Sequence, residues 1–319
     1  LFSEAWKVQE KRWLSRIMQP TIAIILVSSV DSQLEAEIKE AGAEFTELLG
    51  LPKALLPITG GQTVLDYWWA AIEKQRTIND VYLVTNAKEF KHFERWATAR
   101  GIPVSHVVND GSTLKATSLG AARDLVLGLR RASWETIGQP DVLVVAGDSL
   151  FHREFDLSSI LSQSHVLAGS SLLVSYTLSE QEDQRSRGII EVDPKTRRVV
   201  RFLEKPGVGL TDSRTACPLF YILKPELVRR LPEFVESEEA DRGNPRPSLG
   251  AFLQWIILPS IPVYSMRMPG VFRLIGNAGL REYLDLVEHF ERSVKQGFNG
   301  RFGGRESLHR TRHDARHWP

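Results

Sequence analysis

The chain has 319 residues, a length typical of one large domain or two compact ones. Its composition, 42% hydrophobic and 25% charged, is close to that of an average globular protein and excludes a collagen-like, coiled-coil or wholly disordered chain. Forty basic and 39 acidic residues leave a formal charge of +1, so nothing in the overall charge favours nucleic acid or an anionic membrane as a partner.

No apolar run approaches the roughly 18 residues that cross a bilayer, and residues 22–27 are typical of the longest. The first 20 residues mix acidic, basic and aromatic side chains without a small-residue cleavage site, so we expect no secretory signal there. The single cysteine, Cys217, excludes an intrachain disulfide and a cysteine-based zinc cluster. We therefore expect a reducing, cytoplasmic location.

Apolar and charged side chains alternate with helical spacing over residues 1–20, which predicts an N-terminal amphipathic helix. Such a helix can pack on the body of the protein, or it can bind a partner or a membrane surface. The sequence leaves these alternatives open.

Short β-branched runs alternate with helical stretches from residue 21 to about residue 165. This spacing is typical of βαβ units and a mostly parallel sheet. We therefore predict an α/β fold with a Rossmann-like, doubly wound, mostly parallel sheet that has helices on both faces. The strands are expected at residues 22–28, 81–85, 104–108 and 142–146.

From about residue 166 the expected strands lie closer together, which indicates an inserted antiparallel region. These strands are expected at residues 171–177, 188–192, 199–203 and 217–223, with a hairpin turn at 193–196. Helices are expected at residues 225–234 and 280–293, and a surface loop at 236–247. Residues 296–319 carry Gly, Arg and His with little apolar content, which predicts a flexible basic tail.

Ligands of open α/β sheets bind beyond the carboxyl ends of the strands, so the loops that follow the expected strands are the candidate site. Three loops qualify: the one after Ser28, residues 109–113 and residues 147–149. In the third, Asp148 follows a buried strand and a glycine, an arrangement that can hold a divalent cation near phosphates. A helix cap is the alternative role for such an aspartate.

Four motifs occur in order at residues 51–58 (Leu-Pro-Lys-Ala-Leu-Leu-Pro-Ile), 142–148 (Val-Leu-Val-Val-Ala-Gly-Asp), 202–206 (Phe-Leu-Glu-Lys-Pro) and 272–277 (Phe-Arg-Leu-Ile-Gly-Asn). Together they resemble the sugar-1-phosphate nucleotidylyltransferases, which join a nucleoside triphosphate to a sugar phosphate and release pyrophosphate. The resemblance covers residues 21–295. It implies a nucleotide half at residues 21–165 and a sugar-binding half at residues 166–295.

The resemblance also implies roles for the residues that match the family. Lys53 is expected to grip the triphosphate, and Asp148 to ligate magnesium. Glu204 and Lys205 are expected to hold the sugar hydroxyls and the sugar phosphate, with the lysine as a compact point charge. The residues assigned to nucleotide binding are Ser29, Ser32, Gln33, Lys53, Asn109, Asp110 and Gly120, and those assigned to catalysis are Lys53, Asp148 and Lys205.

The implied partners are a nucleoside triphosphate or a nucleotide sugar, together with a sugar phosphate. In the implied reaction the sugar phosphate attacks the α-phosphorus in line, and magnesium and basic side chains stabilise the charge that develops. No protein nucleophile is needed.

The first loop of the chain departs from the family pattern. Where the family has Gly-x-Gly-Thr-Arg-Leu, this chain has Ser29-Val30-Asp31-Ser32-Gln33-Leu34, without either glycine or the arginine. Asp31 would also place a carboxylate near the phosphate oxygens. At 4 Å and an effective dielectric constant of 20, such a repulsion is about 4 kcal/mol.

A second departure affects the metal site. The family has an aspartate before Ile-Gly in the last motif, and this chain has Leu274. A hard cation that loses one of two anionic ligands binds more weakly. We therefore predict impaired or altered metal-dependent chemistry on this fold. An active nucleotidylyltransferase is one alternative, and a regulatory or nucleotide-sugar-binding pseudoenzyme, acting with an active paralogue or as a homo-oligomer, is another.

A more remote alternative is a serine hydrolase of the GDSL type, because residues 147–150 read Gly-Asp-Ser-Leu after a strand. Ser149 would be the nucleophile, His317 the base and Asp314 the orienting carboxylate. The sequence has no evident Gly-x-Asn-Asp oxyanion element, and the alternative leaves Lys53 and Glu204 unexplained.

Overall fold

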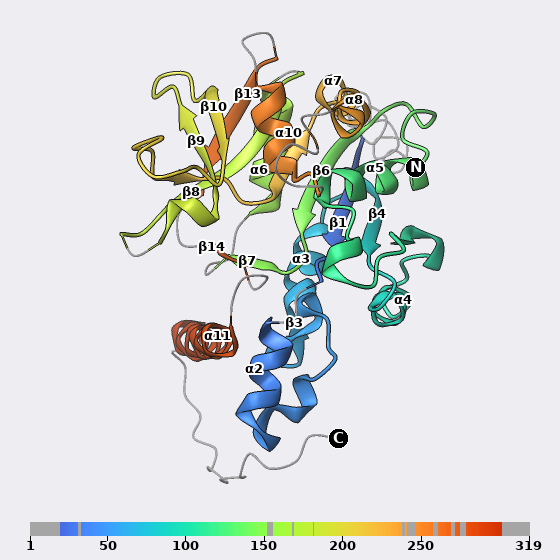
Figure 1. The fold of residues 1–319 in the computed structure, drawn as a ribbon, viewed down its shortest axis with the longest axis vertical. Helices are drawn as coiled ribbons and strands as arrows, with labels where there is room; N and C mark the ends of the chain where they lie inside the picture. The colour runs from blue at the N-terminus through green and yellow to red at the C-terminus, as the bar shows by residue number, and fades with distance from the viewer. Residues whose placement is uncertain are drawn as a thin grey trace, which may run out of the picture.

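The computed structural model (Figure 1) describes residues 20–30, 33–151, 156–167, 169–180, 182–237, 240, 246–257, 261–268, 272–274 and 279–301. The predicted N-terminal helix, the tail after residue 301 and much of the loop predicted at residues 236–247 lie outside the described residues. Within the described ranges, no helix is both long enough and apolar enough to cross a membrane.

A mixed sheet, to which the described residues contribute ten strands, forms the centre of the molecule (Figure 1). Its strands are β1 (Thr21–Val27), β4 (Ile78–Thr85), β5 (Val107–Asn109), β6 (Asp141–Ala146), β8 (Ser171–Thr177), β9 (Gly188–Val192), β10 (Val199–Glu204), β11 (Thr215–Ala216), β12 (Phe220–Leu223) and β13 (Val263–Arg267). The order is β10-β9-β11-β8-β12-β6-β1-β4-β5, and β13 pairs with β8. Neighbours from β6 to β5 are parallel, whereas β12, β8, β11, β9 and β10 pair antiparallel along the sheet order. The pairing of β13 with β8 is parallel. The predicted antiparallel region is therefore confirmed.

Helices cover both faces of this sheet, as predicted. Successive residues of a strand point to opposite faces, so Ile24 of β1 packs in one core cluster with Leu125, whereas Ile25 packs in another with Trp68 and Phe93. The helices on the Ile24 side are α5 (Ala121–Arg131), α7 (Pro225–Val228), α8 (Leu231–Glu236) and α10 (Leu249–Ile256). Those on the Ile25 side are α3 (Val64–Ile72), α4 (Phe90–Thr98) and α6 (Leu157–Val166).

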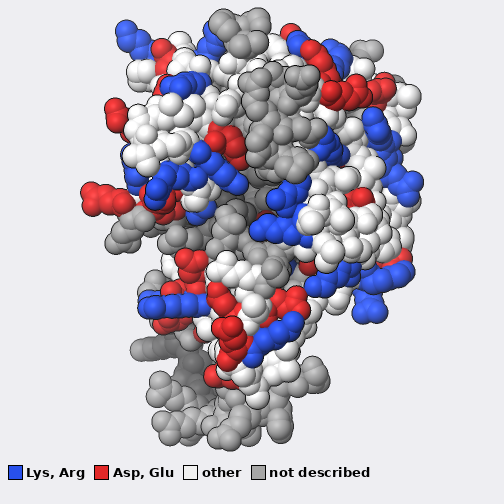
Figure 2. Space-filling model, in the orientation of Figure 1, with Lys and Arg blue, Asp and Glu red and all other residues white. Residues whose placement is uncertain are grey.

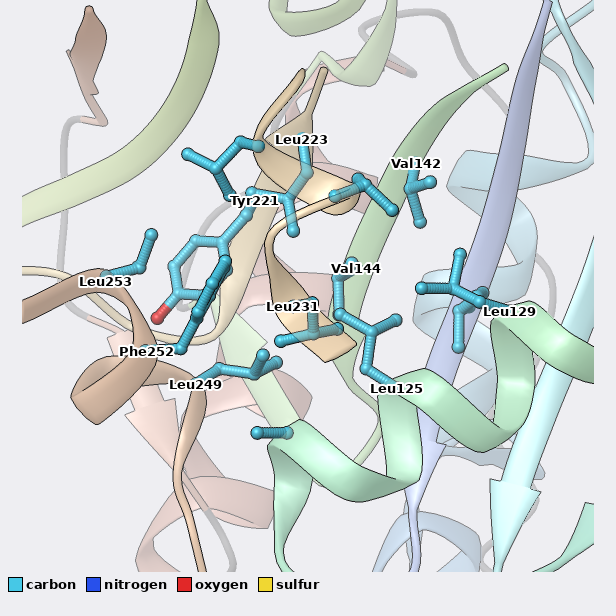
Figure 3. Close-up of a cluster of buried hydrophobic side chains, with 14 of the residues drawn as sticks. Leu125, Leu129, Val142, Val144, Tyr221, Leu223, Leu231, Leu249, Phe252 and Leu253 are labelled. Carbon is cyan, nitrogen blue, oxygen red and sulfur yellow. The ribbon is translucent and has the colours of Figure 1, made fainter. Parts of the chain in front are cut away.

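Figure 3 shows how the parallel and antiparallel regions share one core. Leu125 of α5 and Val144 of β6 lie in the same cluster as Tyr221 of β12 and Phe252 of α10. Because these side chains come from both halves of the chain, the two predicted halves are joined by continuous apolar packing.

A smaller layer lies beside the main sheet, at the lower end of Figure 1. Its elements are α2 (Gln33–Ala41), β2 (Pro57–Thr59), β3 (Gln62–Thr63), β7 (Ser149–Phe151), β14 (Phe272–Leu274) and α11 (Leu280–Arg301), with 3-10 helices at Ala43–Leu48 and Lys53–Leu55. The Leu280 N–H donates to Glu37 Oε2 (2.7 Å), and the Tyr283 hydroxyl donates to the Pro57 carbonyl. The C-terminal helix is thereby fastened to α2 and to the hairpin of β2 and β3.

Several element boundaries differ from the prediction. Residues 104–106 form a 3-10 helix before β5. The strand expected at 217–223 is β12, which begins at Phe220, and the short strand β11 (Thr215–Ala216) precedes the expected start. The helix expected at 225–234 is two short helices, because Pro232 lacks the N–H that a continuous helix needs and is accommodated in the first turn of α8. Helix α11 continues to Arg301, eight residues past its expected end and into the predicted tail.

Candidate functional site

The four parallel strands of the predicted nucleotide half end at one edge of the sheet. In the strand register, Leu26 lies opposite Ala146, Val27 opposite Thr85, and Thr85 opposite Asn109. The loops after β1, β4, β5 and β6 therefore meet at this carboxyl edge, which is where open α/β sheets bind ligands.

A cleft of about 210 Å³ opens beside the loop after β1, and Ser29, Lys53, Lys88, Glu89 and His92 are among its lining residues. Two predicted nucleotide-binding residues, Ser29 and Lys53, are thus brought together. Figure 2 shows Lys and Arg side chains on both sides of the hollow in the middle of the drawn face.

The other residues predicted for the loop after β1 either lie apart from the cleft or lie outside the described residues. Gln33 begins α2, and its amide donates to Glu37 Oε1 (2.9 Å) instead of lining the cleft. Asp31 and Ser32 lie outside the described residues, as do residues 275–277 of the last motif.

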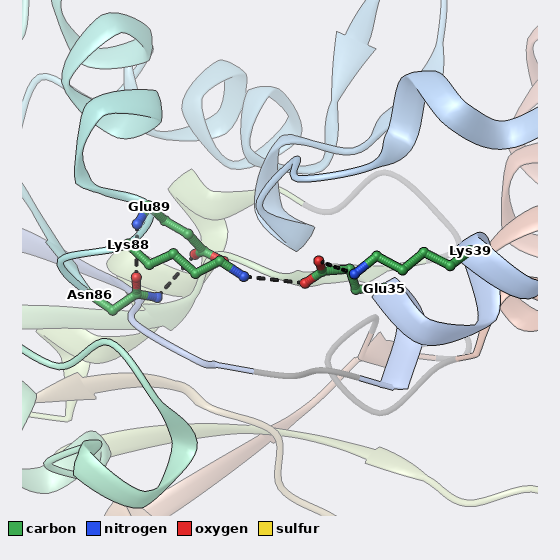
Figure 4. A network of polar contacts seen from close by, with 5 residues as sticks. All are labelled: Glu35, Lys39, Asn86, Lys88 and Glu89. Atoms are coloured by element: carbon green, nitrogen blue, oxygen red, sulfur yellow. Dashed lines mark hydrogen bonds and ion pairs between the residues drawn. The ribbon is translucent and has the colours of Figure 1, made fainter.

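Glu89 is a half-buried carboxyl group within electrostatic reach of Asp148 and Lys53. Burial raises the pKa of Glu89 to about 7; a hydrogen bond from Asn86 and then the charge of Lys88 oppose this rise, and the charges of Asp148 and Lys53 also act on it. The Asn86 amide donates to Glu89 Oε2 (3.1 Å) while the Glu89 N–H donates to Asn86 Oδ1 (2.9 Å) (Figure 4). This turn fixes a carboxyl group, half protonated near neutral pH, beside the two residues predicted to act on phosphate and metal.

Asp148 is held close to β1 because the preceding residue is a glycine. A Cβ atom on Gly147 would lie 2.4 Å from a methyl carbon of Val27. The Gly147 N–H donates to the Leu26 carbonyl (2.9 Å). Asp148 itself is 9% exposed. In the pairing of β14 with β7, Leu274 lies opposite Ser149, so the last motif passes directly beside the Asp148 segment.

A pair of carboxyl groups, Asp110 in the loop after β5 and Asp124 in α5, lies at this edge of the sheet. Asp124, in the first turn of α5, is 1% exposed and accepts a hydrogen bond from the Ser28 hydroxyl (2.5 Å). Burial raises the pKa of Asp124 to about 7; the Ser28 hydrogen bond opposes this, and Asp110 adds to it. Asp110 also accepts from the N–H and hydroxyl of Ser112, and Asn109 Oδ1 accepts from the N–H of Gly111 (2.9 Å). Asp110 and Asn109 thus shape the loop that follows the sheet edge.

Gly120, predicted to lie against the base, has a φ of +87° at the start of α5. A Cβ atom there would lie 2.7 Å from the backbone carbonyl carbon of Arg246, and the next turn of chain is fixed by a 3.0 Å bond from the Ala122 N–H to the Pro247 carbonyl. Both conformation and packing therefore require glycine at this position.

In the sugar half, Glu204 ends β10 and its carboxylate lies against the first turn of α10. A Cβ atom on Gly250 would lie 1.9 Å from Glu204 Oε2, and the Glu204 N–H donates to Gln254 Oε1 (2.8 Å). Burial raises the pKa of Glu204, whereas Lys205 and Ser248 lower it. Lys205 is exposed, with a φ of +48°, so the chain turns sharply after Glu204.

The two halves of the site approach each other through β12. Tyr221 lies opposite Val144 of β6, four residues before Asp148. Burial raises the pKa of the Tyr221 hydroxyl and of the Cys217 thiol, and the charge of Glu204 adds to both shifts. In the sheet order, β9, β11, β8 and β12 lie between β10, which ends at Glu204, and β6, which Asp148 follows.

The serine hydrolase alternative does not fit the geometry of Ser149. This residue is fully buried, and its hydroxyl donates to the Ala146 carbonyl (2.5 Å). A nucleophile has to be reachable by substrate. Asp314 and His317 lie outside the described residues.

Among the described residues, Asp148 is not part of a cluster of metal-ligating side chains. Across the part of the chain that is described, no three His, Cys, Asp or Glu side chains gather closely enough to hold a metal ion. Glu89 is a carboxyl group whose charge couples to Asp148. Hard divalent cations take six or more oxygen ligands, so these residues alone would hold one weakly.

Sequence reasoning missed five polar residues at this edge: Ser28, Asn86, Lys88, Glu89 and Asp124. A signal for the middle three was present, because residues 86–89 follow a buried strand in the same way as the loops that were chosen. Asp124 was also detectable, as a single acidic residue on the apolar face of a helix.

Comparison with known proteins gives a family and a fold. The family model for nucleotidyl transferases matches residues 49–246. A structure assigned as a glucose-1-phosphate thymidylyltransferase from Bacillus anthracis, in complex with sucrose, has 13% identity and a TM-score of 0.59, over 84% of this chain and 95% of that one. A UDP-glucose pyrophosphorylase complexed with UDP-glucose has 15% identity and a TM-score of 0.60, over 86% of this chain and 100% of that one. No curated protein matches the chain in sequence.

Proposed function

The chain belongs to the nucleotidyl transferase family, and we propose that it binds a nucleotide sugar, or a nucleoside triphosphate and a sugar phosphate, with weak metal-dependent transfer between them. The ligand would lie along the carboxyl edge of the sheet, with its nucleotide beside β1, β4, β5 and β6. Its sugar would lie toward Glu204 and Lys205. The similarity in fold to a UDP-glucose pyrophosphorylase complexed with UDP-glucose supports this class of ligand.

In the nucleotide half, Lys53 would neutralise phosphate oxygens in the cleft that it lines with Ser29. Asn109, Asp110 and the backbone of Gly120 would lie along the base. The sharp turns at Asp110 and Gly120 support this placement of the base. At both turns, backbone groups reach the sheet edge, and no long side chain lies between them and the base.

In the sugar half, Glu204 would accept hydrogen bonds from sugar hydroxyls, and the exposed Lys205 would bind the sugar phosphate. A buried carboxylate fixed by α10 has a defined direction, which a hydrogen-bond acceptor for hydroxyls needs. Lysine suits the phosphate as a compact charge on a flexible stem.

Members of this family generally use a divalent metal ion. We propose that magnesium, the family-implied ion, is bound weakly here through Asp148. The observation that carries the proposal is the pairing of Leu274 with Ser149, because it brings a leucine backbone, not an aspartate, beside Asp148. The protein's own lysines and carboxylates therefore carry the ligand-binding role in this proposal.

A regulatory role beside an active paralogue, or within a homo-oligomer, remains compatible with this binding function. The single cysteine, Cys217, is a buried free thiol, which is consistent with the cytoplasmic location that we propose.

Thermal shift of the purified protein tests the proposal, with nucleoside triphosphates, nucleotide sugars and sugar phosphates, each with and without magnesium. A ligand at 100 times its Kd stabilises the folded state by about 2.7 kcal/mol. We expect stabilisation by a nucleotide sugar or sugar phosphate without magnesium. Stabilisation by a triphosphate only with magnesium, followed by pyrophosphate release at about 1 s⁻¹ or faster, would show instead an ordinary transferase.

A further inference from the structure

The cleft beside β1 contains an ion pair that joins its two walls. Glu35, in the first turn of α2, binds Lys88, which follows β4, with 3.2 Å between Glu35 Oε2 and Lys88 Nζ (Figure 4). Both residues line the cleft together with Lys53. The pair therefore lies across the space in which we propose that phosphate groups bind.

Glu35 is held as a carboxylate from two sides. Lys39, one turn along α2, lies 2.9 Å from Glu35 Oε1, and hydrogen bonds from Lys39 and then from Lys88 lower the pKa of Glu35. If Lys88 leaves, Glu35 keeps Lys39 as its partner. Release of Lys88 therefore does not leave an unpaired charge.

Lys88 is positioned to replace the cation that the first loop has lost. The arginine of the family's first loop is Gln33 here, and Gln33 turns to Glu37 on its own helix. Lys88 follows β4 at the carboxyl edge of the sheet, inside the turn that Asn86 and Glu89 fix. Its side chain is 53% exposed, so it can change partner without unpacking the core.

We infer that Lys88 is a phosphate-binding residue of this cleft, and that Glu35 occupies it through an ion pair which the incoming phosphate displaces. Exposed ion pairs contribute little to stability, so a multiply charged phosphate competes well with a single carboxylate. The inference rests on the proposed function, since it names how the phosphates of that ligand are bound. It adds a cation from the β4–α4 turn to the one from Lys53.

The test is titration calorimetry of the full chain with inorganic pyrophosphate at low ionic strength. We expect Lys88→Gln to weaken pyrophosphate binding about tenfold, because one charge contact is lost. We expect Glu35→Gln to tighten it about threefold to fivefold, because the competing carboxylate is gone. Lys91→Gln is the matched control. Lys91 lies in the first turn of α4, three residues after Lys88; its side chain is 71% exposed, is paired with Glu94, and does not line the cleft.

Opposite effects of the two variants, with Lys91→Gln unchanged, support the inference. Equal affinities of Lys88→Gln and Lys91→Gln would overturn it, and so would weaker binding in Glu35→Gln. The proposed function is tested separately by the thermal-shift panel. If a nucleotide sugar stabilises the wild type and Lys88→Gln alike, the inference about Lys88 is wrong and the function stands. If no ligand of the panel binds, the function is wrong, although pyrophosphate can still reveal an anion site at Lys88.

Discussion

The two halves of the site hold their carboxyl groups in opposite ways. In the nucleotide half, the half-buried Glu89 and the buried Asp124 lie near other carboxylates, and the pKa of each is raised to about 7. In the sugar half, Glu204 is a single carboxylate with Lys205 beside it, and Gly250 leaves the space into which it fits. The first arrangement reduces negative charge by protonation, and the second keeps one carboxylate in a defined place.

This difference is what we expect of a chain that keeps the sugar part of the family chemistry better than the phosphate part. A site for phosphates needs positive charge. In the nucleotide half, however, the loops after β4 and β5 bring carboxyl groups to the edge of the sheet. The family model begins at residue 49 and ends at residue 246, so it includes Glu204 and Lys205 but neither the loop at 29–34 nor Leu274. Both departures from the family pattern thus lie outside the matched segment, on the phosphate side.

The largest expected effect is on stability, from Asp124→Asn. A folded-state pKa of about 7 against an ordinary value of 3.8 means that the folded protein keeps a proton which the unfolded chain has lost. The free energy of unfolding therefore falls as the pH rises from about 4 to about 7, and stays low above that. Asparagine cannot ionise and still accepts from Ser28, so we expect the variant to gain about 2 to 4 kcal/mol over wild type at pH 8.

Chemical denaturation at pH 5 and pH 8 measures this gain. Asp285→Asn, on an exposed position of α11, is the control and should follow the wild type at both values. If Asp124→Asn also follows the wild type, the buried pair of Asp124 and Asp110 does not set the charge of the nucleotide half.

Leu274→Asp is the next largest change, and it addresses the metal side of the comparison. The variant returns a carboxylate to the strand that pairs with Ser149 beside Asp148. Charge-stabilising groups in phosphoryl transfer contribute about 10³ to 10⁵ in rate. We expect about a 100-fold rise in magnesium-dependent pyrophosphate release over wild type. Leu274→Asn, equal in size and uncharged, is the control, and equal rates for the two variants would show that the lost carboxylate is not what limits transfer.

Gly250→Ala tests the sugar side, with a smaller expected effect. The new methyl group would lie 1.9 Å from Glu204 Oε2, so the carboxylate has to move. Hydrogen bonds to charged groups contribute about 1.5 to 3 kcal/mol, and partial loss of one predicts about tenfold weaker binding of a sugar phosphate. Calorimetry with a sugar phosphate measures this loss of affinity. Gly207→Ala is the control, because a Cβ atom on Gly207 meets nothing within 4 Å. Unchanged binding in Gly250→Ala would remove Glu204 from the sugar site.

The sequence predicted those parts of the molecule that depend on local pattern. Buried strands such as residues 142–146 are apolar throughout, and the Gly-Asp that follows them is recognisable without a structure. The antiparallel region was predicted from strand spacing, and its hairpin is fixed by the Asp193 carboxylate, which accepts from the Lys195 and Thr196 N–H groups.

Contacts between distant segments could not be predicted in this way. The bond from Ser28 to Asp124 joins residues 96 positions apart, and the ion pair of Glu35 with Lys88 joins residues 53 positions apart. Nothing in the local pattern shows that α2 and the turn after β4 face the same cleft. The predicted roles of Lys53, Asp148 and Glu204 come from resemblance and stay predictions until ligand binding is measured.

The smallest expected effect is that of Ser149→Ala, which separates a framework role from a chemical one. The Ser149 hydroxyl donates to Ala146 and its carbonyl accepts from the Trp68 indole N–H (2.8 Å), so the residue fastens the Asp148 segment to α3 from behind. Loss of one buried hydrogen bond predicts about 1 kcal/mol lower stability and less than a twofold change in ligand binding. Denaturation and a p-nitrophenyl ester assay check both. Ester hydrolysis by the wild type that disappears in Ser149→Ala would support the serine hydrolase alternative. A side chain that only supports the Asp148 segment is not a nucleophile, so its removal would leave such an activity in place.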